Sequence, residues 1–219
     1  MRFLSRSGFV AGLLGLSVLS AAPAYAARNA DAEQYVQQNA TAALQTLGDR
    51  TVPAAQRRQT FNALIVRFAD MPRVASFVLG RYGAQLRSDA ALRDEWVAAF
   101  QDYSVAVYET QLDRYSGGAI RVTDSVERVP GRDVIVSSEI TPRGSARPLP
   151  VQWRMLRTGD TWKVVDVSLL LEGNQIWLAQ QQQAEFIAVL GRNNGDIRTL
   201  AANVRGQTAS MRQRVLARG

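Results

Sequence analysis

The chain has 219 residues, of which 47% are hydrophobic, so it is long enough for a single domain with a substantial core. It contains no His and no Cys, which excludes disulfides, Ser-His-Asp triads, His-based acid–base catalysis and His metal sites. Its 26 basic and 19 acidic residues give a net charge of +7, a balance that suits contact with anionic membranes or acidic partners.

Residues 1–26 have the features of a secretory signal peptide. Arg2 and Arg6 form a basic start, the apolar run FVAGLLGLSVLSAAPA follows, and the segment AYA ends in a small-x-small cleavage pattern. The apolar run is short for a membrane-spanning helix, and no Cys follows it to carry a lipid anchor. We therefore expect cleavage after Ala26 and export of a soluble mature chain. No nucleic-acid partner is expected, because no basic stripe with interleaved aromatic residues is present.

The first half of the mature chain predicts helices. Apolar periodicity and helix stop signals place helices over residues 31–48 and from about Pro53 to Asp70, and a short apolar helix follows over 73–82. A long amphipathic helix is expected over 89–115, with its large apolar residues on one stripe. This half of the chain therefore supplies several apolar helix faces, which must pack against another layer.

The second half predicts an antiparallel sheet followed by helices. Four strand-like runs are separated by short breaks: 119–128, 132–141, 149–157 and 161–172. Helices are expected over 175–190 and 194–204, and residues 206–219 form a basic C-terminal tail. The order predicts an α+β fold over residues 27–205, with N-terminal and C-terminal helices packed on a curved, four-stranded antiparallel sheet.

The last predicted strand, in the segment TWKVVDVSLLLEG, has two apolar faces. Under strict alternation, Trp162 and Val164 face one way, whereas Val165, Val167 and Leu169 face the other. An ordinary dry core can cover both faces, and so can a cavity for an apolar ligand between the sheet and its helices. The spacing of the residues does not separate these two explanations.

Polar residues offer weaker candidates for function. Asp166 lies between two valines, and burial could raise its pKa for acid–base chemistry together with Tyr103 or Tyr108. Equally, a carboxylate in that setting can pair with an arginine or cap backbone N–H groups. Three arginines could hold a phosphate headgroup or lie on a solvated surface: Arg73, Arg81 and Arg114.

Several motifs, in order along the chain, resemble those of the Mla-type periplasmic phospholipid-binding proteins, also called toluene-tolerance auxiliary proteins, which include a hopanoid-associated branch. The motifs are FADMPRVASFVLGRY (68–82), FQDYSVAVYETQLDRYSG (100–117), VIVSSEI (134–140), LPVQWRM (149–155) and TWKVVDV (161–167). Two departures stand out. The family usually has Trp where this chain has Gly83, and its last strand is followed by a shorter segment than residues 168–186 of this chain.

The resemblance implies a carrier rather than an enzyme. Proteins of this family move phospholipid across the periplasm between an outer-membrane lipoprotein complex and an inner-membrane ABC transporter complex, which they contact transiently. The implied fold is related to the NTF2-like group, and the acyl chains lie between sheet and helices with the headgroup near solvent. A monomer without cofactor, metal or catalytic residue suffices for this role.

Three other functions stay open at this stage: a carrier of hopanoids or other lipids, a non-catalytic adaptor of a membrane transport complex, and an NTF2-like enzyme that uses a buried carboxylate and Tyr. For a lipid carrier, we expect large apolar side chains to contact the acyl chains. The expected lipid-binding residues are Phe68, Val74, Phe77, Val78, Phe100, Tyr103, Val107, Val136, Ile140, Trp153, Val164 and Val167.

Overall fold

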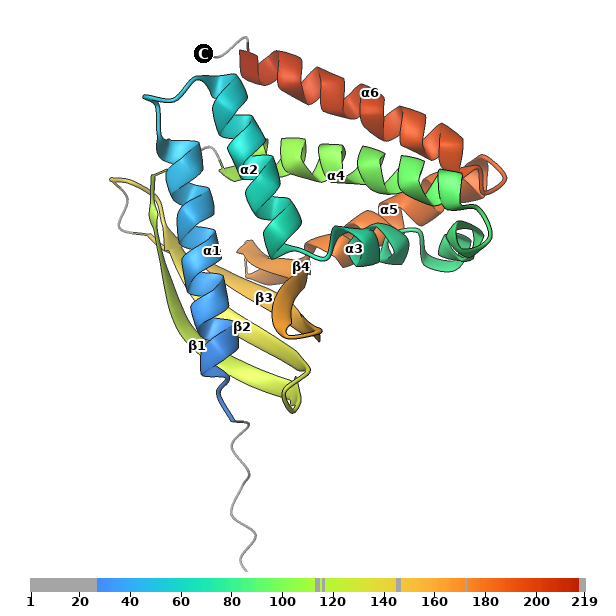
Figure 1. The fold of residues 1–219 in the computed structure, drawn as a ribbon. Helices are drawn as coiled ribbons and strands as arrows, with labels where there is room; N and C mark the ends of the chain where they lie inside the picture. The colour runs from blue at the N-terminus through green and yellow to red at the C-terminus, as the bar shows by residue number, and fades with distance from the viewer. Residues whose placement is uncertain (1–26, 113–114, 116, 145–146, 172, 217–219) are drawn as a thin grey trace, which may run out of the picture.

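The computed structural model describes residues 27–112, 115, 117–144, 147–171 and 173–216 (Figure 1). The predicted signal peptide lies outside these residues. The helices are α1 (Ala30–Gly48), α2 (Ala54–Phe68), α3 (Met71–Phe77), the 3₁₀ helix η1 (Gly80–Arg87), α4 (Ala90–Leu112), α5 (Leu178–Arg192) and α6 (Ile197–Leu216). The strands are β1 (Ala119–Val129), β2 (Asp133–Thr141), β3 (Leu149–Thr158), β4 (Thr161–Leu171) and β5 (Asn174–Trp177).

The α+β class is confirmed, but the prediction of a four-stranded sheet is wrong. The sheet has five strands in the order β1-β2-β3-β4-β5, and all neighbouring strands are antiparallel. The extra strand, β5, forms where the helix over 175–190 was predicted to begin. Gly173 adopts a φ of +81°, which other residues rarely adopt, and this turn folds β5 back onto the end of β4. Helix α5 therefore begins only at Leu178.

Helix α6 is longer than the sequence predicts. It continues past residue 204 to Leu216, so the predicted boundary between domain and tail lies inside a helix. Two arginines of this part of α6 pair with acidic residues of α4. Arg205 lies 3.0 Å from Glu95, and Arg212 lies 3.1 Å from Asp102. The two arginines are seven residues apart, so they lie on the same side of α6 and hold it along α4.

A β-bulge in β4 explains the two apolar faces of this strand. Arg154 pairs with Asp166 and the next residue of β3, Met155, pairs with Val164, so Val165 has no partner in the ladder. The extra residue shifts the alternation by one position. Val164 and Val167 consequently face the same side of the sheet, and strict alternation along 161–172 is a wrong prediction.

Two hydrophobic cores lie on either side of α2. One core joins α1 to the inner face of the sheet, and it includes Val36, Val136 and Met155. The other lies among the helices α2–α6 and is centred on Trp96. Figure 1 shows the same division, with α1 lying along the sheet and α4, α5 and α6 stacked beside it. Among the described residues, no helix combines the length and hydrophobicity that a membrane crossing needs.

The side chain of Gln37 fixes the position of α1 along the edge of the sheet. Its amide oxygen accepts a hydrogen bond from Val122 N, and its amide nitrogen donates to Ile120 O, both at 3.0 Å. The amide therefore satisfies the edge of β1 in the way that another strand would. At the start of α1, the side-chain oxygen of Asn29 accepts a hydrogen bond from Ala32 N at 2.9 Å and caps the helix.

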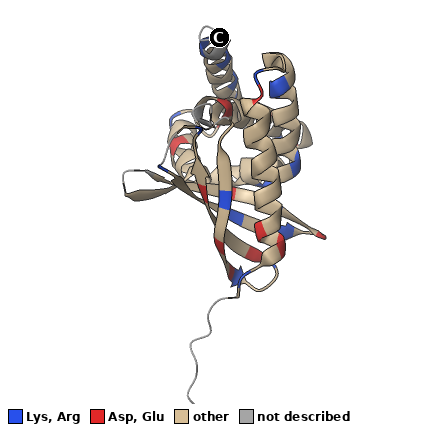
Figure 2. Ribbon diagram, turned by 90° about the vertical axis from the view of Figure 1, so that its left-hand side faces the viewer, with Lys and Arg blue, Asp and Glu red and all other residues tan. Residues whose placement is uncertain are grey.

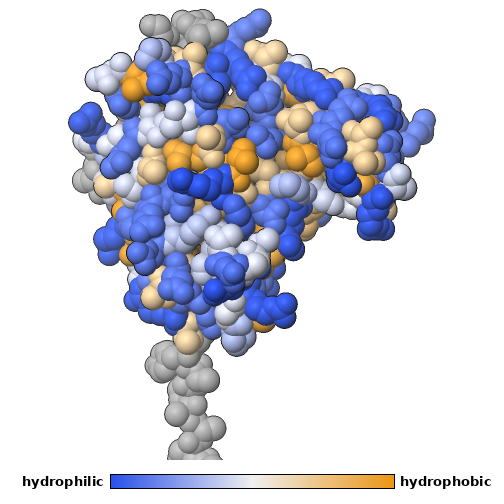
Figure 3. Space-filling view, in the orientation of Figure 1, coloured by the Kyte–Doolittle hydropathy of each residue, from blue (hydrophilic) through white to orange (hydrophobic). Residues whose placement is uncertain are grey.

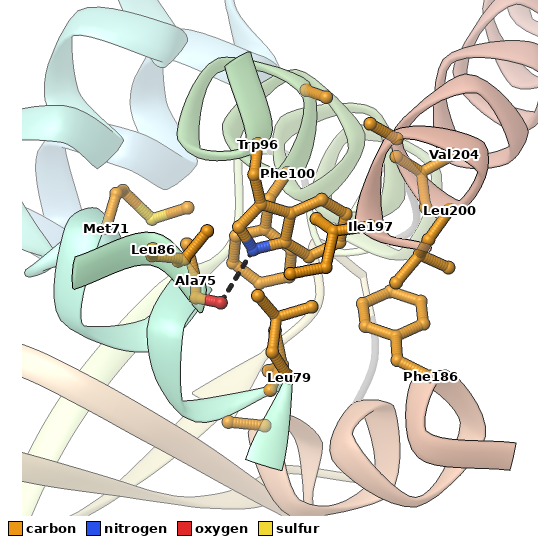
Figure 4. Packing of buried hydrophobic residues seen from close by; sticks show 14 of the residues in the cluster. Met71, Ala75, Leu79, Leu86, Trp96, Phe100, Phe186, Ile197, Leu200 and Val204 are labelled. Carbon is orange, nitrogen blue, oxygen red and sulfur yellow. Dashed lines mark hydrogen bonds between the residues drawn. The ribbon is translucent and has the colours of Figure 1, made fainter. Parts of the chain in front are cut away.

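The helical core depends on Trp96, whose side chain is fully buried (Figure 4). Its Nε1–H donates to the carbonyl oxygen of Ala75 at 2.7 Å, and its ring meets Phe186 edge to face at 5.7 Å between centroids. The indole thus joins α3, α4 and α5 through one side chain, and its only polar atom is satisfied.

We expect Trp96→Phe to lower the free energy of unfolding by about 1–3 kcal/mol, because it removes a buried hydrogen bond and leaves unfilled space. Denaturant unfolding measures the change. Phe77→Leu is the control, because Phe77 is 43% exposed and its replacement should change stability by no more than about 0.5 kcal/mol. Equal stability of Trp96→Phe and wild type would contradict the assignment.

Candidate binding cavity

A cavity of about 720 Å³ lies between α1, α2 and the inner face of the sheet. This volume is in the range of small-ligand sites, about 300–1,000 Å³. The described lining residues are Ala40, Ala43, Leu44, Phe61, Ile65, Phe68, Ala69, Tyr108, Thr110, Tyr115, Ile140, Leu149, Val151, Trp153, Val164, Val167, Leu169, Ile176, Leu178 and Gln181. None of these residues carries a charge at neutral pH, although the chain as a whole is rich in arginine.

The cavity exists because small residues stand on one of its walls. Ala40 and Ala43 are one turn apart on α1, and they present only methyl groups to the space in front of the sheet. The opposite wall consists of larger side chains from β2, β3 and β4, such as Ile140 and Val151. Both hydrophobic cores contribute to the lining, so the cavity separates them.

An aromatic pair forms one part of the wall. The rings of Phe68 and Trp153 lie 5.5 Å apart between centroids, and Tyr35 lies 5.6 Å from Phe68 on the other side. The indole N–H of Trp153 donates to Ser138 Oγ at 2.8 Å. An apolar ligand would therefore meet the ring carbons of Trp153 without leaving its N–H unpaired.

Other polar groups in the wall also have partners within the protein. Thr110 Oγ1 donates to Ala106 O at 2.9 Å, and Gln181 Nε2 donates to Glu185 Oε1 at 3.1 Å. Across the described residues, no cluster of three or more acidic, His or Cys side chains could hold a metal ion. The arrangement favours apolar contact with a ligand over polar recognition or metal chemistry.

Five of the expected lipid-binding residues line the cavity: Phe68, Ile140, Trp153, Val164 and Val167. All five come from the end of α2 or from the inner face of the sheet. They lie together for two reasons. The bulge in β4 keeps Val164 and Val167 on one face of the sheet. The chain directly after α2 also joins β4, because Asp70 N donates to Val164 O at 2.9 Å.

The other seven expected residues lie outside the cavity wall. Val78 and Phe100 are buried in the helical core, and Val74 and Tyr103 pack at its edge. Val136 is fully buried between α1 and the sheet, Val107 is half-buried on α4, and Phe77 is 43% exposed. Helices α3 and α4 turn their apolar stripes toward α5 and α6, whereas the sequence interpretation turned them toward the sheet.

Sequence reasoning missed the wall formed by α1 and by Phe61 and Ile65 in the second half of α2. Ala40, Ala43 and Leu44 share one face of α1, and Phe61 and Ile65 share one face of α2. The helical spacing of these residues is visible in the sequence, but spacing does not show that this face of α1 and α2 borders the cavity, and an expectation based on large side chains omits Ala40 and Ala43. The space itself comes from the alanines, which that criterion passes over.

The polar candidates take structural roles in most cases. Arg73 pairs with Asp70 at 2.9 Å, and the guanidinium of Arg81 lies over the ring of Tyr82 at 4.8 Å from its centroid. Neither arginine lines the cavity, and Arg114 lies outside the described residues. Asp166 is only 8% exposed, and its carboxylate accepts backbone N–H groups from Val167 and Ala179.

Burial changes the acidity of the groups next to the cavity. Burial raises the pKa of Asp166, although two backbone hydrogen bonds and the charge of Arg154 oppose this shift. Burial, together with the negative charge of Asp166, raises the pKa of Tyr108 to about 12. The Tyr108 hydroxyl therefore stays protonated at any physiological pH.

The family model described as MlaC protein matches residues 36–205 of this chain. The chain belongs to the MlaC family. A solved structure of a phospholipid-binding protein from Ralstonia solanacearum, in complex with a phospholipid, has a similar fold with a TM-score of 0.70 and 20% sequence identity. The similarity covers 83% of this chain and 99% of the Ralstonia chain. A comparison with curated proteins gives no match.

The two departures from the family pattern have clear places in the structure. Gly83 lies in η1, where a Cβ atom would come within 2.8 Å of Ser76 O, so a larger residue requires the backbone to move. The longer segment 168–186 forms the end of β4, all of β5 and the first half of α5. Three residues of this segment, Ile176, Leu178 and Gln181, form part of the cavity wall.

The pKa of Tyr108 gives a testable dependence of stability on pH. The folded state keeps the proton up to about pH 12, whereas an unfolded Tyr loses it near pH 10, so stability falls as the pH rises from about 10 toward 12. In Tyr108→Phe this contribution is absent. Between pH 8 and pH 11, the free energy of unfolding of the wild type should fall by about 1 kcal/mol more than that of Tyr108→Phe. Parallel unfolding curves for the two proteins across this range would contradict the prediction.

Proposed function

We propose that this MlaC-family protein is a periplasmic carrier that binds phospholipid acyl chains in the cavity between α1, α2 and the sheet. It carries the lipid between the outer and inner membranes, and it docks transiently, as a monomer, on an outer-membrane lipoprotein complex and an inner-membrane ABC transporter complex. The observation that carries the proposal is the cavity of about 720 Å³ with no charged residue in its described wall. The phospholipid complex of the Ralstonia protein supports the choice of ligand.

The energetics of transfer suit a carrier without an energy source of its own. Burial of each CH₂ group contributes about 0.8 kcal/mol, so one long acyl chain gains on the order of 10 kcal/mol over water. A bilayer offers a similar gain, and the two environments therefore nearly balance. Small differences in affinity at the two membrane complexes are then enough to direct loading and release.

An enzyme that uses Asp166 with Tyr103 or Tyr108 has less support. Asp166 is not among the lining residues, and its Oδ1 accepts two backbone N–H groups at 2.8 and 2.9 Å. Tyr108 does line the cavity, but its pKa of about 12 makes it a poor base at neutral pH. The two groups therefore lack the arrangement that acid–base work on a bound ligand requires.

A charge-driven adaptor also has less support than a carrier. Figure 2 shows basic and acidic residues interleaved along the helices and strands of the displayed side, without a large area of one sign. Figure 3 shows a mostly hydrophilic face with apolar residues gathered across its middle. Arginines of α6 that could serve such a surface pair with acidic residues of α4 instead.

Native mass spectrometry of residues 27–219, purified from an exported preparation, tests the carrier directly. We expect a discrete added mass that solvent extraction identifies as phospholipid, and its size gives the number of acyl chains. A hopanoid mass would keep the carrier role but change the ligand. A bare protein mass that stays unchanged after incubation with phospholipid vesicles would refute the proposal.

Val167→Asp tests the site within the protein. The substitution places a carboxylate in an uncharged wall, where its desolvation opposes lipid binding. We expect at least about a tenfold loss of extractable phospholipid per protein, with the far-UV circular dichroism spectrum unchanged. Val126→Asp is the matched control, because Val126 is 44% exposed on β1 and lies away from the cavity. Equal lipid content in the two variants would contradict the assignment of the site.

A further inference from the structure

Helix α5 begins without a cap from its own sequence. Its N-cap residue, Trp177, makes no side-chain hydrogen bond to the helix, and no acidic residue occurs in its first turn. The first N–H groups of a helix have no partner within the helix and need an acceptor. Ala179, in this first turn, is only 3% exposed, so water has little access to satisfy its N–H. The start of α5 therefore depends on another part of the chain.

Asp166 supplies the missing acceptor from β4. Its Oδ1 accepts Ala179 N–H at 2.9 Å and Val167 N–H at 2.8 Å. The carboxylate thus acts as a cap from a different element, and its negative charge is favourable at the N-terminal end of a helix. Such a contact between a strand and a helix start fixes the distance between the two elements.

The bulge in β4 gives Asp166 this orientation. Because Val165 is an extra residue in the strand, Val164 and Val167 both face the cavity, while Asp166 is directed toward the start of α5. The same irregularity therefore completes the apolar wall and aims the carboxylate at the helix. Loss of the contact would act on the wall without changing any residue that faces the ligand.

The segment that Asp166 holds forms part of the cavity wall. Ile176 of β5, together with Leu178 and Gln181 of α5, lines the cavity. A second contact supports this segment on the outer face of the sheet, where Gln175 Nε2 donates to Ser168 Oγ at 2.9 Å. Tyr108 of α4, which is half-buried and also lines the cavity, lies close enough to Asp166 to respond to its charge.

We propose that Asp166 is a positioning residue that holds the β5–α5 segment against the cavity and thereby controls how fast bound lipid is released. This inference rests on the carrier function proposed above, and it adds that Asp166 helps to set how long a lipid stays bound. It also assigns a role to the segment 168–186, in which the chain departs from the family pattern. Asp166 does not contact the ligand, because it is absent from the described cavity wall.

The test compares lipid release by wild type, Asp166→Asn and Asp166→Ala. Each protein is loaded with phosphatidylglycerol that carries a fluorescent acyl chain, and transfer to phosphatidylcholine vesicles is followed in time. We expect Asp166→Ala to release lipid about tenfold faster, the size of effect that corresponds to the loss of one helix cap. Asp166→Asn keeps an acceptor oxygen but loses the charge, so its rate should lie between the other two.

Ser125→Ala separates positioning from a general loss of stability. Ser125 is 1% exposed on β1, at the edge of the sheet opposite β5, and its Oγ accepts a hydrogen bond from Asn29 N at 2.8 Å and donates to Glu33 Oε1 at 2.6 Å. We expect this variant to lower the thermal midpoint and leave the release rate unchanged. Amide hydrogen exchange provides a second readout: residues 178–181 should exchange faster in Asp166→Ala and not in Ser125→Ala.

Different results would overturn the two proposals. Equal acceleration of release in Asp166→Ala and Ser125→Ala, or unchanged exchange at residues 178–181 in Asp166→Ala, would overturn the role of Asp166. Failure of the wild-type protein to take up the fluorescent phospholipid would refute the carrier function instead. In that case the exchange measurement alone decides whether Asp166 holds the start of α5.

Discussion

The bulge at Val165 is the feature on which the cavity and its surroundings depend. Without it, Val164 and Val167 would face opposite sides of the sheet, and one valine would be lost from the apolar wall. Asp166 would then be directed into the uncharged interior, where an isolated carboxylate is strongly unfavourable. One extra residue therefore keeps the charge out of the cavity and places it where two backbone N–H groups donate hydrogen bonds to the carboxylate.

The division into two hydrophobic cores gives the cavity its size. A single continuous core would be packed without space for a ligand, because protein interiors approach the density of organic crystals. Here Trp96 and its neighbours complete the packing of the helices by themselves, and Val136 and Met155 complete the packing of α1 on the sheet. The small side chains of Ala40 and Ala43 then leave the space between the cores open. Residues at the margins of both cores line this space, so the packing of the two cores also shapes the cavity.

Several arginines of this basic chain have a structural role, because they align α6 with α4. Along α6, Arg198, Arg205 and Arg212 recur every seven residues, and each pairs with an acidic residue of α4. Such exposed pairs contribute little individually, but a row of them fixes the alignment of two helices. The basic excess of the chain is therefore used in part to hold the helical layer together, and the cavity wall stays free of charge in its described part.

The sequence by itself determined the α+β class, the order of helices and strands, and the membership in a lipid-binding family, because periodicity, turn residues and local motifs carry these properties. The expectation that Phe68, Trp153 and Val164 contact a ligand stays a prediction, and the structure shows that all three line the cavity. Only the tertiary structure decided the fifth strand, the direction of the α3 and α4 stripes, and the role of Asp166. A bulge, a hairpin turn and the choice between two apolar layers depend on contacts between distant segments, and residue spacing along one element does not encode them.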